Sequence, residues 1–76
     1  MATEYKGKTY DDRHGGPFDR GSADSYYRRG CFPHYFKDAT YRSEEVTEES
    51  MTVEEVEAYL AGYDYNENLG NFKIWD

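Results

Sequence analysis

The chain has 76 residues, with 16 acidic and 9 basic side chains and a formal net charge of −7, so its length allows one domain and no more. It has no apolar run near the roughly 20 residues of a membrane-spanning helix, so we expect neither a membrane segment nor a signal peptide. One cysteine excludes an intramolecular disulfide and favours a reducing compartment, the cytoplasm.

Charge and aromatic residues are distributed unevenly. Residues 1–42 hold eight basic and six acidic side chains, a net charge of +2, whereas residues 43–76 hold ten acidic side chains and one basic, a net charge of −9. The chain also has nine Tyr, four Phe and one Trp, but few aliphatic residues. We therefore expect aromatic rings to supply most of the packing, and the charge asymmetry bears on partners rather than on fold.

The first predicted segment is an arm. Residues 1–17 contain three glycines and a proline among polar side chains and show no helical period. We expect an irregular, flexible arm over 1–17 that precedes a single small helical domain over 18–76.

A first helix is predicted over 19–29. Asp19 or Ser22 can cap its start, and Gly30 suits the left-handed residue that follows a helix. Its apolar face is spaced at i, i+3 and i+4: Ala23, Tyr26 and Tyr27. Residues 30–42 then carry four rings, which predict an irregular aromatic connector packed across the helices: Phe32, Tyr35, Phe36 and Tyr41. Residues 43–50 are polar and acidic, which is typical of a solvated linker.

A second helix is predicted over 53–65. Thr52 and Glu55 have the spacing of a capping box, and the small residue Gly62 suits a close approach by another backbone or ring. In the tail, Trp75 either folds back over the core or is offered to a partner. We expect a mostly α helix–loop–helix miniprotein, monomeric or homodimeric, whose helices pack through seven side chains: Tyr26, Tyr27, Val53, Val56, Tyr59, Leu60 and Tyr63.

Catalytic and metal chemistry have little support in the sequence. Cys31, His34 and His14 are three Cys/His side chains where a structural zinc site usually needs four ligands. Cys31 is predicted to be a small side chain that is buried or half-buried. His14 with its two following glycines resembles a hydrolase oxyanion loop, but no nucleophile motif accompanies it. We expect no enzyme, no cofactor and no metal.

Two surfaces are candidates for binding. The first is an acidic face that could dock on a basic groove of another protein, although solubility alone also explains such charge. Its members are Glu44, Glu45, Glu48, Glu49, Glu54, Glu55 and Glu57. The second is a basic and aromatic set suited to stacking bases and contacting phosphates. Its members are Arg20, Arg28, Arg29, Tyr35 and Phe36.

The residues 19–27, Pro33-His34-Tyr35 and 58–63 together resemble short proteins of tailed bacteriophages, and more distantly the ribosome modulation factor family. That family has an Arg-Gly helix start, a Cys-Pro-Tyr connector and a second helix with an aromatic–Gly pattern. Its proteins are basic, whereas this chain is acidic. The resemblance implies a phage protein that binds and inhibits or redirects a host protein in nucleic-acid handling or defence. The alternative is a modulator that binds RNA or the ribosome.

Overall fold

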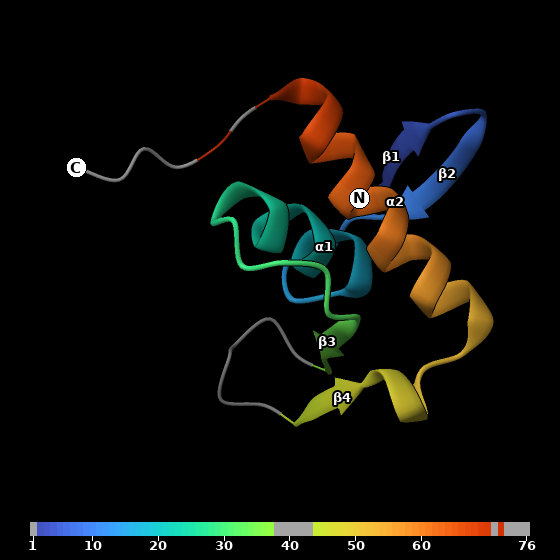
Figure 1. The fold of residues 1–76 in the computed structure, drawn as a ribbon. Coiled ribbons are helices and arrows are strands. Elements are labelled where there is room, and N and C mark those ends of the chain that lie inside the picture. Colours follow the sequence, from blue (N-terminus) through green and yellow to red (C-terminus); the bar gives the residue numbers. More distant parts are fainter. Residues whose placement is uncertain (1, 38–43, 71, 73–76) are drawn as a thin grey trace.

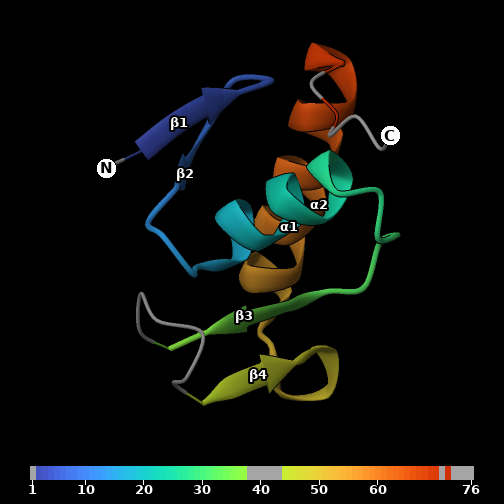
Figure 2. The same ribbon diagram turned by 90° about the vertical axis from the view of Figure 1, so that its left-hand side faces the viewer.

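The computed structural model describes residues 2–37, 44–70 and 72. Two helices cross at its centre, and two separate two-stranded antiparallel sheets lie on different sides of the helix pair (Figures 1 and 2). The prediction of a mostly helical helix–loop–helix protein is therefore wrong. Three segments predicted to be irregular contribute strands: the arm, the aromatic connector and the acidic linker.

The predicted irregular arm is a β-hairpin. β1 (Ala2–Tyr5) pairs with β2 (Lys8–Asp11), and Lys6 and Gly7 form the two-residue turn with φ of 51° and 81°. Two consecutive positive φ values define the type I′ turn, whose twist matches that of the paired strands. Lysine is an unusual residue at positive φ, so Lys6-Gly7 is a weak signal for such a turn.

Aromatic contacts hold this hairpin on the helices. The ring of Tyr10 stacks on Phe18 at 5.5 Å between centroids, and Tyr5 meets Tyr65 edge to face at the same distance. The Tyr5 hydroxyl also donates to Asp64 in the second helix. These contacts supply the packing that an isolated two-stranded hairpin lacks.

α1 (Pro17–Tyr26) begins and ends earlier than predicted. Gly16 is its N-cap and Pro17 its first residue, a position where the missing proline N–H costs nothing. Asp19 lies in the first turn and accepts from the Gly15 N–H at 2.9 Å. At the other end, Arg28 follows the C-cap and is left-handed, with φ of 58°; Gly30 also has the predicted positive φ, 94°, but lies two residues further on.

α1 and α2 (Val53–Leu69) cross in close contact at two glycines. A Cβ atom built on Gly21 would lie 2.0 Å from the Tyr59 carbonyl oxygen, and one on Gly62 would lie 2.1 Å from the Phe18 carbonyl oxygen. Only glycine permits such an approach of backbone to backbone. The expectation that Gly62 faces another backbone is confirmed.

This crossing decides which side chains are buried. Among the described residues the buried hydrophobic side chains are Phe18, Val46 and Tyr59. Of the seven predicted packing residues only Tyr59 is fully buried, and Val53 and Leu60 are 72% and 45% exposed. The prediction was wrong for those two because Gly62 lies on the face of α2 that packs on α1, and Val53 and Leu60 lie outside that face.

The second sheet joins the connector to the acidic segment. β3 (His34–Phe36) pairs with β4 (Glu45–Thr47), with Tyr35 opposite Val46, and a 3₁₀ turn, η1 (Glu48–Ser50), follows. The predicted solvated linker thus contains a strand with a buried valine. The prediction that Tyr41 packs with the connector falls outside the described residues.

The capping box at the start of α2 is confirmed. The Thr52 hydroxyl accepts from the Glu55 N–H at 3.1 Å, and the Glu55 carboxylate accepts from the Thr52 N–H at 2.8 Å, which lowers the pKa of Glu55. The helix continues four residues past the predicted end and stops at Gly70, whose φ is 68°. No helix in the described part of the chain is long and apolar enough to cross a membrane. The prediction for Trp75 falls outside the described residues.

Candidate functional site

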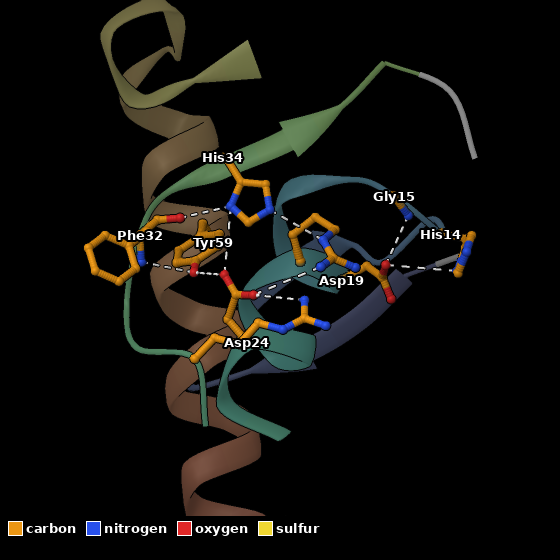
Figure 3. A network of polar contacts seen from close by, with 9 residues as sticks. His14, Gly15, Asp19, Asp24, Phe32, His34 and Tyr59 are labelled. Atoms are coloured by element: carbon orange, nitrogen blue, oxygen red, sulfur yellow. Dashed lines mark hydrogen bonds and ion pairs between the residues drawn. The ribbon is translucent and has the colours of Figure 1, made fainter. Parts of the chain in front are cut away.

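A buried carboxylate lies between α1, α2 and the connector (Figure 3). Asp24 is 3% exposed, and its carboxylate accepts a hydrogen bond from the Tyr59 hydroxyl. Three further groups lie within 4 Å of it: Arg20 Nη2 at 3.8 Å, Arg29 Nη1 at 3.6 Å and His34 Nδ1 at 3.6 Å. A buried charge with several partners of this kind organises its surroundings and is costly to disrupt.

Tyr59 and His34 tie the connector to this carboxylate. The Tyr59 hydroxyl accepts from the Phe32 N–H at 3.1 Å, while His34 Nδ1 lies 2.8 Å from the Phe32 carbonyl oxygen. On the other side of the ring, His34 Nε2 accepts from Arg20 Nε at 3.4 Å. This pattern corresponds to the His34 tautomer with its proton on Nδ1. The backbone at Phe32 is thereby fixed against both helices.

The same network makes the fold sensitive to alkali. Burial, reinforced by the hydrogen bond to Asp24, raises the pKa of Tyr59 far above its ordinary value of 10.0. An unfolded tyrosine ionises near that value, so the folded state retains a proton that the unfolded state loses. The contribution of Tyr59 to stability is therefore complete below pH 10 and falls as the pH rises further.

We expect the wild-type protein to lose its helical circular dichroism as the pH is raised above about 10. Tyrosinate absorbance should rise in the same transition, because Tyr59 ionises only on unfolding. The Tyr59→Phe variant is the control: its free energy of unfolding should depend less on pH in this range. Ionisation of every tyrosine with the helical signal intact would contradict the prediction.

A groove opens on the outer side of this network. It has a volume of about 320 Å³ and lies between the connector and the β4–η1 segment. Its walls are formed by Phe32, Pro33, His34, Glu45, Thr47, Glu48 and Glu49. Phe32 is 70% exposed although its backbone N–H is held by Tyr59, so a rigid support presents an apolar ring to solvent. The groove thus combines an exposed ring with three carboxylates.

The seven predicted acidic residues fall into two groups. Three are engaged: Glu44 pairs with Lys37 at 3.5 Å, Glu57 pairs with Lys8 at 3.0 Å, and Glu55 caps α2. The other four have no ion pair with a cation of the described residues: Glu45, Glu48, Glu49 and Glu54. Three of these four line the groove, so unpaired negative charge gathers there.

The structure brings together only part of the predicted basic and aromatic set. Arg20, Arg29 and Phe36 line one pocket, whereas Tyr35 and Arg28 do not line it. Arg20 is 6% exposed and lies in the Asp24 network, with its guanidinium 5.7 Å from the Phe36 ring. Arg29 shares the same carboxylate. Tyr35 lies in β3 beneath the Arg13 guanidinium, 5.9 Å away. Arg28 is exposed beyond the end of α1, with its guanidinium 4.9 Å from the Phe72 ring.

Cys31 is exposed, so the prediction that it is buried or half-buried was wrong. It lies in the segment between α1 and β3. Partial desolvation of its sulfur, with the charges of Asp24 and Glu48, raises the pKa of the thiol, which disfavours a nucleophilic thiolate. No group of three or more His, Cys, Asp or Glu side chains in the described part of the chain could hold a metal ion.

Asp24 and Phe32 are the residues that sequence reasoning missed. The spacing of Arg20 and Asp24, four residues apart in a helix, was an available sign of an ion pair. The sequence predicts that Phe32 is one more packing ring, and nothing in its local sequence indicates that it points outward. Comparisons with protein-family models, curated proteins and solved structures found no match, so the groove is interpreted from its own chemistry.

Proposed function

We propose that this chain is a non-enzymatic phage-type protein that binds a host protein through the groove between Phe32 and the β4–η1 segment. The proposed partner surface is basic and belongs to a nucleic-acid-handling or defence protein in the bacterial cytoplasm, which is inhibited or redirected by the contact. One observation carries the proposal: an exposed aromatic ring on a rigid support lies beside three carboxylates that have no described cation partner, Glu45, Glu48 and Glu49.

This combination suits protein recognition. An aromatic side chain that enters a partner's pocket contributes much of an interface's affinity, and a charged rim sets the partner and the rate of encounter. Because the Phe32 N–H is already held by Tyr59, covering the ring costs the rotamer freedom of one side chain but no ordering of the backbone there. The carboxylates would steer a basic partner towards the ring.

The alternative of RNA or ribosome binding has weaker support. Two of its three arginines are already bound to Asp24, and Arg20 is buried. Affinity for nucleic acid depends largely on cations that are free to neutralise phosphates. Around the groove the charge is negative, which would repel a phosphate backbone. RNA binding is therefore kept as an outcome of the experiment below.

The experiment is capture from bacterial lysate, with and without nuclease, followed by affinity measurement on the purified partner. We expect to capture one protein, whose binding persists after nuclease treatment and weakens as the salt concentration rises. Glu48→Gln with Glu49→Gln should lower the affinity about tenfold, since two exposed ion pairs of roughly 0.7 kcal/mol each would be lost. Phe32→Ala should lower it by at least about tenfold through loss of the anchor.

The matched control is Glu44→Gln with Glu57→Gln. It removes the same charge from two glutamates that already pair with Lys37 and Lys8, so partner affinity should change by less than about threefold. Equal losses of affinity in both double variants would mean that net charge matters and its position does not. That result would contradict the proposal. Capture of ribosomal components that nuclease releases, and that Arg28→Glu with Arg29→Glu abolishes, would favour the RNA alternative instead.

A further inference from the structure

β4 is the open edge of its sheet. In an antiparallel pair, residues whose backbone groups face the neighbouring strand alternate with residues whose groups face away. The Lys37 N–H donates to the Glu44 carbonyl oxygen at 3.2 Å, so this pair and the Tyr35–Val46 pair face inward. The backbone N–H groups of Glu45 and Thr47, together with the Glu45 carbonyl, therefore point away from β3.

The outer edge of β3 is closed in a way that the edge of β4 is not. The Phe36 N–H donates to the Gly15 carbonyl oxygen at 2.8 Å, and the Phe36 carbonyl oxygen accepts from Arg13 Nη2 at 3.0 Å. Among the described residues, none makes a comparable hydrogen bond to the outward groups of Glu45 or to the Thr47 N–H. Figure 2 shows β4 at the lower boundary of the molecule, with β3 on one side only.

We propose that β4 receives an extended basic segment of the partner protein as a third strand. The proposal rests on the function proposed above and specifies how the partner is held. Main-chain hydrogen bonds to Glu45 and Thr47 would provide the pairing, as in other cases of strand addition to a free sheet edge. The pairing would end at Thr47, which caps the 3₁₀ turn.

Side-chain alternation connects this edge to the groove. Glu45 and Thr47 line the groove with Glu48, Glu49 and Phe32, whereas Val46 is buried on the opposite face. Every second side chain of an added strand would lie on the groove face. Lysine or arginine at those positions would reach the carboxylates, and the intervening residues would lie on the Val46 side.

Charge argues for a basic partner and against a second copy of this chain. Pairing of two β4 strands would bring two Glu45 carboxylates together, along with Glu48 and Glu49 of each copy. Like charges on neighbouring strands are destabilising. The acidic side chains of β4 thus oppose self-association at an edge that would otherwise invite it.

The test uses the full-length protein labelled with ¹⁵N and a synthetic peptide of about eight residues that alternates lysine with valine, long enough to span β4. We expect the amide signals of Glu45 and Thr47 to shift and their hydrogen exchange to slow by about tenfold at saturation. The Gly7 amide, in the distant hairpin turn, is the internal control and should not change.

Two changes, one in the protein and one in the peptide, then remove the main-chain pairing alone. Thr47→Pro deletes the outward N–H without changing charge, at an edge position that tolerates proline, and should weaken peptide binding at least about tenfold. Thr47→Val keeps the N–H and should bind within about threefold of wild type. A peptide methylated on alternate backbone nitrogens should also fail to bind the wild-type protein, which gives a result even if the proline variant does not fold.

The outcomes separate this inference from the proposed function. Equal binding of the plain and methylated peptides, lost in Glu48→Gln with Glu49→Gln, would overturn strand addition and leave the acidic groove as a binding site. Peptide binding that none of these changes affects would contradict both proposals. No detectable binding of the plain peptide would overturn the strand addition, while capture of a partner from lysate would still test the groove.

Discussion

Replacing Gly21 with alanine should unfold the protein or cost about 3 kcal/mol or more, although alanine is the better helix former by about 1 kcal/mol. The added methyl group would lie 2.0 Å from the Tyr59 carbonyl oxygen, and that atom belongs to a helix backbone that cannot turn aside. Gly62→Ala should behave in the same way against Phe18. Urea denaturation followed by circular dichroism measures both free energies of unfolding.

The matched control is Ser22→Ala, one residue further along α1. It adds no contact at the crossing and should change the free energy of unfolding by less than about 0.5 kcal/mol. A domain of this size has a total stability of only roughly 5 kcal/mol, so the glycine variants should lack a sharp transition at physiological temperature. Gly21→Ala with wild-type stability would show that the helices do not cross as described.

Tyr59→Phe should cost about 2–4 kcal/mol, a larger effect than most losses of a hydroxyl. The change leaves the Asp24 carboxylate without its hydroxyl donor and the Phe32 N–H without its acceptor, both at a site where the tyrosine side chain is fully buried. Thermal and urea denaturation should both report the loss. The connector should also loosen, which hydrogen exchange at the Phe32 amide would detect.

Tyr63→Phe is the control for this change. Tyr63 lies one turn further along α2 and is half-buried, and its hydroxyl makes no hydrogen bond to another described side chain or backbone group. Its loss should cost less than about 0.5 kcal/mol. Similar costs for the two variants would mean that ring packing, and not the Asp24 network, explains the importance of Tyr59.

Sequence signals predict the structure correctly where the interaction joins residues that are close in the chain. The capping box joins Thr52 to Glu55 within one turn, and both of its hydrogen bonds are present. Gly62 predicts a place of close approach because glycine inside a helix is otherwise unfavourable. The identity of its neighbour, the Phe18 carbonyl, depends on tertiary structure and could not be predicted.

The strands escaped prediction because their signals are weak or distant. β4 is three residues long and buries a single side chain, Val46, so it has no alternating pattern to detect. β1 and β2 are joined by Lys6-Gly7 instead of the Asn-Gly or Asp-Gly pair that marks such turns. The acidic residues of the groove were all predicted, but Phe32 joins them only through the Tyr59 and His34 contacts made in the folded protein.

The site where β1 docks on α2 has a consequence for the order of folding. Tyr5 is bound by Asp64 and Asn68, which follow it by 59 and 63 positions. The hairpin can close on its own within microseconds, but Tyr5 cannot reach its partners until the last turns of α2 have been synthesised. β1 is thus made before α2 but reaches its place only after α2 has been made. Until then Tyr5 stays uncovered, so a nascent chain of this protein passes through a stage that exposes aromatic surface.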